Sequence, residues 1–92
     1  MTQDQILIEA REALEQNRME EALEILTNQK LVESNEVLLL KGEILYKLER
    51  WGEAHNTFAR ILELFPQDTR ASSYIELIQN ILQFYHKDLL NP

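Results

Sequence analysis

Few of the residues that carry enzyme chemistry occur in this chain of 92 residues. It has no cysteine, which excludes disulfide frameworks, thiol catalysis and cysteine-ligated zinc or iron–sulfur sites. The two histidines, His55 and His86, lie 31 residues apart, and neither forms an HExxH or HxxxH motif. Glycine stands only at positions 42 and 52, so a glycine-rich phosphate loop is also excluded.

The remaining polar groups fit surface roles better than catalytic ones. Ser72-Ser73 has no nucleophile-elbow sequence around it, and serine is common in the first turn of a helix. Glu20-Glu21, and Glu49 with Glu53, are paired carboxylates, but general acid–base catalysis needs a water-poor cleft and no apolar sequence surrounds them. We therefore expect a protein that is not an enzyme, with no catalytic residue, no cofactor and no metal ligand.

The charge of the chain narrows the choice of partners. Sixteen acidic and nine basic residues give a formal net charge of −7, and a negative protein repels the phosphate backbone of nucleic acids. No segment approaches the roughly 20 apolar residues of a membrane span. The N-terminus lacks the pattern of a signal peptide and the chain lacks cysteine. We therefore expect a cytoplasmic location, with neither nucleic acid nor membrane as a partner.

Apolar residues recur at intervals of three and four along the chain, which is the spacing of amphipathic helices. Alternating strand patterns and hairpin-turn dipeptides are nearly absent, so the sequence predicts an all-α fold of about five helices. The third predicted helix is apolar on nearly every side apart from Lys41, Glu43 and Lys47, and such a helix is buried on several sides.

Capping signals mark where the predicted helices begin. Thr2 followed by Gln5, and Asn17 followed by Glu20, both have the form of a capping box for the first two helices. The short break around Asn17 allows only an antiparallel arrangement of these two helices.

The ends of the later helices carry signals of the same kind. Ser34 or Asn35 can cap the third helix, Pro66 ends the fourth, and Asp68 caps the fifth. These three helices are predicted over Val37–Leu48, Trp51–Leu64 and Thr69–His86.

The chain contains an internal repeat. Arg18–Ala22 (RMEEA) matches Arg50–Ala54 (RWGEA) at an offset of 32 residues, and the same offset pairs Ala10 with Gly42. Small residues at these positions let the first helix of a hairpin approach the second, and a large residue further along the second helix fills the space beyond. The repeat therefore predicts two stacked helical hairpins.

This pattern resembles the tetratricopeptide repeat (TPR), a helix–turn–helix unit of about 34 residues with the signature W-x₂-L-G-x₂-Y…A-x₃-F…P. Residues 35–68 match it well, while residues 3–34 are a degenerate copy two residues shorter than the family period, with Ser34 in place of the proline. The resemblance therefore leaves the length of the second helix open. The positions that carry the resemblance or close the turn are Ala10, Ala22, Leu26, Leu38, Gly42, Leu45, Trp51, Ala54, Phe58 and Pro66.

The resemblance implies one domain over residues 1–92, stacked as a right-handed superhelix and closed by a capping helix and tail over residues 69–92. It also implies a concave groove, lined by the first helix of each hairpin, that binds a peptide or an amphipathic helix of a partner protein. In co-chaperone members of the family, Lys and Asn side chains in the groove clamp the C-terminal carboxylate of a peptide. This chain has Leu7, Arg11, Leu39 and Glu43 at such positions, which disfavours that binding mode. The groove residues implied are Leu7, Arg11, Leu14, Leu39, Glu43, Tyr46, Lys47 and Leu77.

Two other functions stay open from the sequence. The apolar faces could instead be buried by self-association, which would make the chain a homodimer or another homo-oligomeric building block. A subunit of an enzyme is the third possibility. Burial of the groove by the helices of the chain itself would weaken the peptide-binding interpretation.

Overall fold

The computed structural model describes residues 2–85 of the chain. This part folds into five helices and contains no strand, which confirms the all-α prediction. The end of the predicted fifth helix, from His86 onward, lies outside the described residues. The helices are α1 (Gln3–Glu15), α2 (Met19–Thr27), α3 (Asn35–Lys47), α4 (Trp51–Leu64) and α5 (Thr69–Tyr85).

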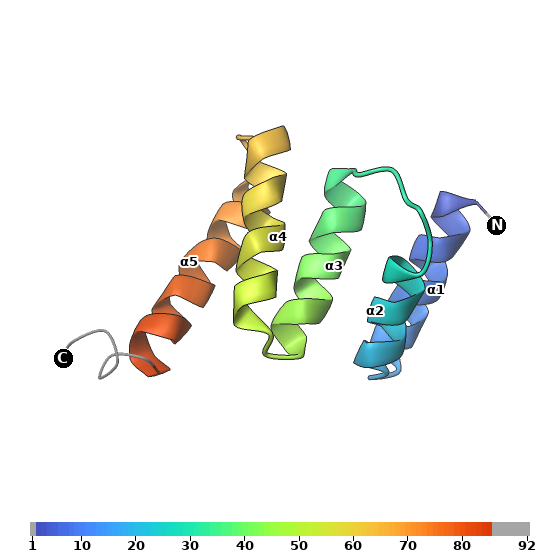
Figure 1. Cartoon of the computed structure of the whole chain (residues 1–92), viewed down its shortest axis with the longest axis horizontal. Helices are drawn as coiled ribbons and strands as arrows, with labels where there is room; N and C mark the ends of the chain where they lie inside the picture. The colour runs from blue at the N-terminus through green and yellow to red at the C-terminus, as the bar shows by residue number, and fades with distance from the viewer. Residues whose placement is uncertain (1, 86–92) are drawn as a thin grey trace.

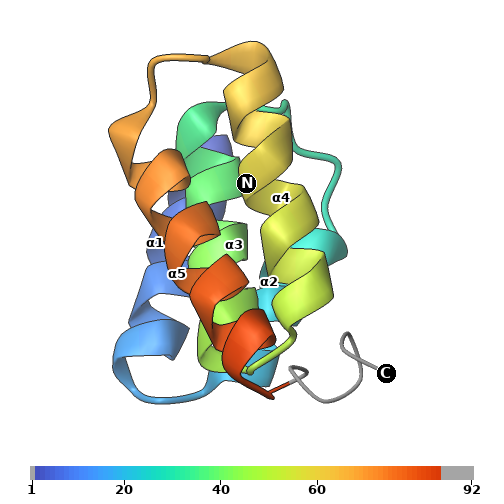
Figure 2. The same cartoon turned by 90° about the vertical axis from the view of Figure 1, so that its left-hand side faces the viewer.

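The helices follow one another along the long axis of the molecule (Figure 1). α1 and α2 form one antiparallel hairpin, and α3 and α4 form the second. Viewed along the stack, α1, α3 and α5 lie in one layer and α2 and α4 in the other (Figure 2). Both hairpins and α5 contribute to one hydrophobic core. A right-handed superhelix of the TPR type is compatible with this arrangement and stays a prediction.

The two hairpin turns have the same backbone structure, which extends the internal repeat from sequence to geometry. Asn17 (φ 63°) and Glu49 (φ 61°), separated by the repeat offset of 32, both adopt the left-handed conformation. The amide of the following arginine donates to a carbonyl five residues back in each turn: Arg18 to Ala13 at 2.8 Å and Arg50 to Leu45 at 2.9 Å. Both turns are Schellman motifs, which satisfy the last carbonyls of a helix before the chain reverses.

The predicted capping box at Asn17 is wrong. Arg18 is the N-cap of α2 and makes no capping hydrogen bond through its side chain. Asn17 is instead the left-handed residue that ends α1, a conformation that asparagine tolerates better than most residues. One residue cannot serve both ends of so short a turn. Arg18 instead pairs with Glu21 one turn into α2, at 3.2 Å.

The other predicted caps are present. Thr2 and Gln5 form the reciprocal capping box at the start of α1. The Ser34 hydroxyl accepts the Val37 amide at 3.2 Å, so α3 begins at Asn35, two residues before the predicted start. α3 ends at Lys47, one residue before the predicted end.

α2 is shorter than its counterpart in the second hairpin. It has nine residues, whereas α4 has fourteen, and the chain leaves α2 as a loop that reaches α3 at Ser34. This loop is held to the start of α1 by two hydrogen bonds between Gln3 and the Val32 backbone, at 3.1 and 3.3 Å. The early end of α2 leaves part of α3 uncovered.

Most of the residues that carry the repeat signature are buried. Trp51 is half-buried against the core, and Pro66 is exposed in the turn before α5. The others are buried in the core: Ala10, Ala22, Leu26, Leu38, Gly42, Leu45, Ala54 and Phe58.

Gly42 is the point of closest approach between α3 and α4. A Cβ atom at Gly42 would lie 2.7 Å from two ring carbons of Phe58, far inside van der Waals contact. The Phe58 ring has little freedom to move, because it is fully buried and stacks on Tyr74 of α5 at 4.5 Å between ring centroids. Gly52, in the first turn of α4, would place a Cβ in open space.

These two glycines give a matched pair of substitutions. Gly42→Ala is expected to lower the free energy of unfolding by about 1–3 kcal/mol through overpacking against Phe58. Gly52→Ala is expected to raise it by about 0.5–1 kcal/mol, because alanine favours the helix and nothing obstructs its methyl group. Urea unfolding followed by circular dichroism measures both. Equal effects of the two changes would contradict the close packing at Gly42.

Asp68 connects the starts of α5 and α3. Its side chain is 6% exposed, accepts the Ala71 amide at 3.0 Å and accepts the Asn35 amide group at 3.4 Å. The Ala71 hydrogen bond, with smaller effects of Asn35 and Arg70, outweighs burial and lowers the pKa of Asp68 below its usual value. The carboxylate form is therefore the one that stabilises the fold.

Asp68→Ala is expected to destabilise the protein by about 1 kcal/mol at neutral pH through loss of the helix cap. The pKa of Asp68 is lower in the folded chain, so its charge stabilises the fold above the unfolded pKa of about 3.9. That stabilisation is lost as the pH falls through the folded value. Denaturant unfolding at pH 7 and pH 2 should show a smaller difference between wild type and variant at pH 2. Asp68→Asn, which keeps a capping oxygen, is the control and should lose less at pH 7.

Candidate functional site

The residues predicted to line a groove all come from the layer of α1, α3 and α5, but they differ in exposure. Arg11 and Lys47 are exposed, and Leu77 on α5 is 48% exposed. Half-buried positions are Leu14, Glu43 and Tyr46. We call these six side chains, which are apolar and charged, the first-helix face.

Leu7 and Leu39 do not contribute to that surface. Each is only 6% exposed and belongs to the hydrophobic core. Neighbouring helices cover them, as expected if the chain buries part of the predicted groove itself. They offer a partner almost no area for contact.

Tyr46 lies at the centre of an aromatic cluster on α3, α4 and α5. Its ring makes edge contacts with Trp51 and with Tyr74, both at 5.2 Å between centroids. Burial, followed by the nearby charge of Glu43 and by Tyr46, raises the pKa of Tyr74. The cluster holds the exposed edge of Tyr46 in a fixed position beside Glu43.

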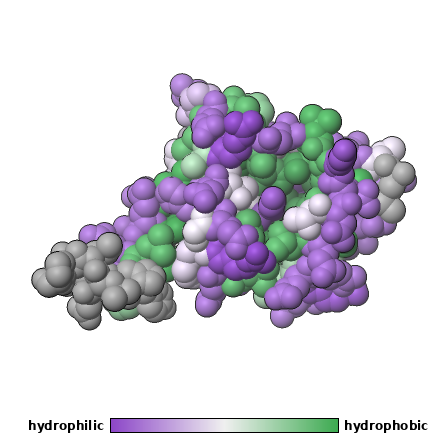
Figure 3. Space-filling view, in the orientation of Figure 1, coloured by the Kyte–Doolittle hydropathy of each residue, from purple (hydrophilic) through white to green (hydrophobic). Residues whose placement is uncertain are grey.

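A second surface lies on the opposite face of the molecule, where α3 is visible between α2 and α4. The space-filling view shows apolar surface sunk between the polar ridges of these two helices (Figure 3). This hollow, the α2–α4 pocket, has a volume of about 480 Å³. Its lining comes from the end of α2, the following loop, α3 and α4: Leu26, Thr27, Gln29, Leu31, Glu33, Val37, Leu38, Lys41, Asn56, Thr57 and Arg60.

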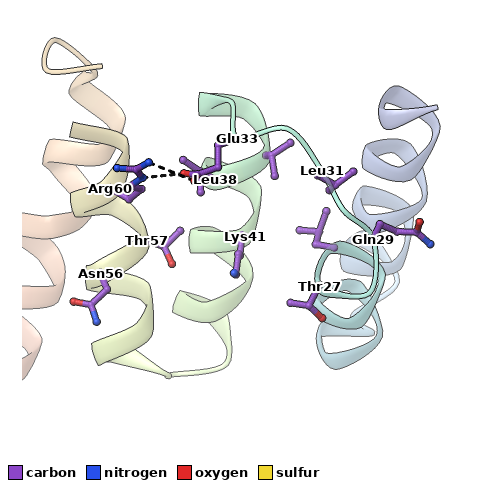
Figure 4. Close-up of a pocket in the computed structure, with 11 residues that line it drawn as sticks. Thr27, Gln29, Leu31, Glu33, Leu38, Lys41, Asn56, Thr57 and Arg60 are labelled. Carbon is purple, nitrogen blue, oxygen red and sulfur yellow. Dashed lines mark hydrogen bonds and ion pairs between the residues drawn. The ribbon is translucent and has the colours of Figure 1, made fainter. Parts of the chain in front are cut away.

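Charged groups occupy the middle and one end of the pocket (Figure 4). Arg60 binds Glu33 through Nε at 2.9 Å and Glu63 through Nη1 at 2.9 Å. The hydrogen bonds from Arg60, with the charges of Arg60 and Lys41, lower the pKa of Glu33. Lys41 lies near the middle of the pocket and forms no ion pair with any residue in the described part of the chain.

The described residues contain no cluster that could hold a metal ion. Within residues 2–85, no three His, Asp or Glu side chains gather closely enough to hold a metal ion. His55 is half-buried on α4, and Ser72 and Ser73 are exposed near the start of α5. Over the same residues, none of the helices combines the length and the apolar character needed to cross a membrane.

Comparisons with protein-family models, curated proteins and solved structures give no match for this chain. The resemblance to the TPR family therefore rests on the residues named above and on the duplicated hairpin geometry.

The sequence pattern did not identify the α2–α4 pocket. Two signals point toward it in retrospect: Lys41 interrupts an apolar helix, and the first repeat is two residues shorter than the family period. Neither signal shows that α2 ends at Thr27, which is what opens the pocket.

Leu39 and Leu77 allow the two kinds of groove position to be compared. Leu39→Glu is expected to destabilise the protein by about 3–5 kcal/mol, because it buries an unpaired charge. Leu77→Glu is expected to change the free energy of unfolding by less than about 0.5 kcal/mol, since its side chain is already half in water. Thermal unfolding followed by circular dichroism distinguishes them. A Leu39→Glu variant as stable as wild type would contradict the core position of Leu39.

Proposed function

We propose that this chain is a non-enzymatic protein-interaction module that binds a peptide or an amphipathic helix on the first-helix face. The observation that carries the proposal is the exposed apolar side chain of Leu77, which lies on α5 three residues after Tyr74, the residue whose ring contacts Tyr46. Apolar surface with charged residues at its border is typical of protein docking sites. Glu43 and Lys47 supply charges of both signs there.

The packing of the layer supports this choice. α3 is covered on one side by α4, while its outward positions on the first-helix face are exposed or half-buried. Leu14, Tyr46 and Leu77 place one apolar side chain on each of α1, α3 and α5. Apolar anchors spaced along a groove are what an amphipathic helix requires.

Self-association is the second candidate, and the two ends of the stack favour it. Ile8 on α1 is 54% exposed and Leu77 on α5 is 48% exposed, so apolar side chains face solvent at both terminal helices. A second copy stacked on either end would bury one of them. Burial of a leucine-sized side chain contributes about 1.5–3 kcal/mol, which is useful to so small a fold.

One set of variants tests both candidates. Leu77→Glu removes the apolar contact on the first-helix face, and Leu64→Glu is the matched control, because Leu64 is 39% exposed at the end of α4. The immobilised chain should capture a partner from a cell extract. Leu77→Glu should reduce that capture by about tenfold or more, and Leu64→Glu should leave it unchanged.

Light scattering over a wide concentration range completes the test. The interaction module is supported if the wild-type chain is a monomer and if Leu77→Glu, but not Leu64→Glu, loses the captured partner. A concentration-dependent dimer that Leu77→Glu dissociates, without capture of any other protein, supports the homo-oligomer instead. Equal capture by all three proteins would refute a docking site at Leu77.

A further inference from the structure

The α2–α4 pocket occupies room that a longer α2 would fill. Ile61, in the last turns of α4, is fully buried. At the repeat offset of 32, its counterpart is Gln29, which lies beyond the end of α2 and is exposed. The first hairpin therefore lacks an apolar side chain at this position. Leu31, which is half-buried, and Leu38, which is 8% exposed, line the pocket that remains.

One cation in the pocket has no ion pair, although the chain carries a net charge of −7. Arg60 pairs with Glu33 in the pocket and with Glu63 beside it, whereas Lys41 pairs with no described residue. Glu33 lies within the electrostatic reach of Lys41, but it accepts its hydrogen bonds from Arg60. The Lys41 ammonium group and the Asn56 amide make no hydrogen bond to any described residue, which leaves donors available for an acceptor.

We propose that the α2–α4 pocket binds a helical segment of another protein that carries a large apolar side chain and, one turn away, a carboxylate. The apolar side chain enters beside Leu31, and the carboxylate pairs with Lys41. The volume of about 480 Å³ is within the range of small-ligand pockets and is ample for one large side chain. This site lies opposite the first-helix face and does not depend on it.

The second hairpin indicates why the partner segment should be helical. α4 has fourteen residues and α2 has nine, so the last turns of α4 have no helical counterpart in the first hairpin. The pocket lies where those missing turns of α2 would be. A partner turn placed in the pocket would extend the layer of α2 and α4 and cover the half-buried Leu31 and Lys41. Residues three or four apart on a helix lie on one face, so the apolar group and the carboxylate reach the pocket together.

A library of random peptides displayed on phage, selected on the intact chain, is the probe. Selected peptides are expected to carry a large apolar residue with Asp or Glu three or four positions away. Their synthetic versions, measured by fluorescence anisotropy, should bind Lys41→Met about tenfold more weakly than wild type, because the aliphatic stem is kept and only the charge is lost. Higher salt should weaken binding to wild type and hardly affect binding to Lys41→Met.

Lys47→Met is the matched control, since it removes the same charge from the same helix on the first-helix face. It should leave the affinity unchanged, as should Leu77→Glu. Leu31→Ala, in the loop before α3, tests the apolar contact separately and should also weaken binding. Circular dichroism confirms that each variant is folded.

Selected peptides that lose affinity with Leu77→Glu bind the first-helix face and are set aside. Three results for the remaining peptides would overturn the proposal: no peptide remains, the remaining peptides are basic or purely apolar, or Lys41→Met and Lys47→Met weaken them equally. A wild-type dimer in light scattering that Lys41→Met dissociates would assign the pocket to a second copy and refute a foreign partner. Leu77→Glu can abolish capture of a partner from a cell extract without affecting peptide binding in the pocket. The two proposals can therefore be refuted separately.

Discussion

The contact between Gly42 and Phe58 is the constraint on which the rest of the structure depends. The absence of a side chain at Gly42 lets the Phe58 ring lie directly against α3. The same ring stacks on Tyr74 of α5, and Tyr74 contacts Tyr46 of α3. Three helices are thereby joined through aromatic packing, with Phe58 fully buried between them. A small domain buries few side chains and packs them closely, so one close contact of this kind fixes the distance between its helices.

The same turn reverses the chain in both hairpins, whereas the different lengths of α2 and α4 determine which parts of α3 are exposed. Asn17 and Glu49 reverse the chain through the same pair of hydrogen bonds, so both hairpins begin alike. They differ where α2 ends at Thr27 and α4 continues to Leu64. The regular part of the repeat therefore builds the core, and its irregular part creates the α2–α4 pocket. A perfect repeat would have covered the same region of α3 with a helix.

Much of the fold was predictable because it follows from local physical signals. The number of helices follows from apolar spacing, and most of their ends follow from caps at Thr2, Ser34 and Asp68. The cap at Asn17 was predicted wrongly because the end of one helix and the start of the next compete for a single residue. The site was less predictable. The TPR resemblance implies that Leu39 and Leu77 both line the groove, but only the packing shows that Leu39 is covered and Leu77 is not.

The position of α3 explains why two surfaces can coexist on so short a chain. Lys41 and Glu43 are two residues apart, which separates them by about 200° around the helix axis, so they face opposite sides of the molecule. Residues between and beside them, Leu40, Gly42 and Ile44, are buried. α3 is therefore the rigid centre of the domain and at the same time contributes a charged side chain to each face. A substitution at either charge alters one face and leaves the buried residues in place, so the two proposed sites can be tested independently in one folded protein.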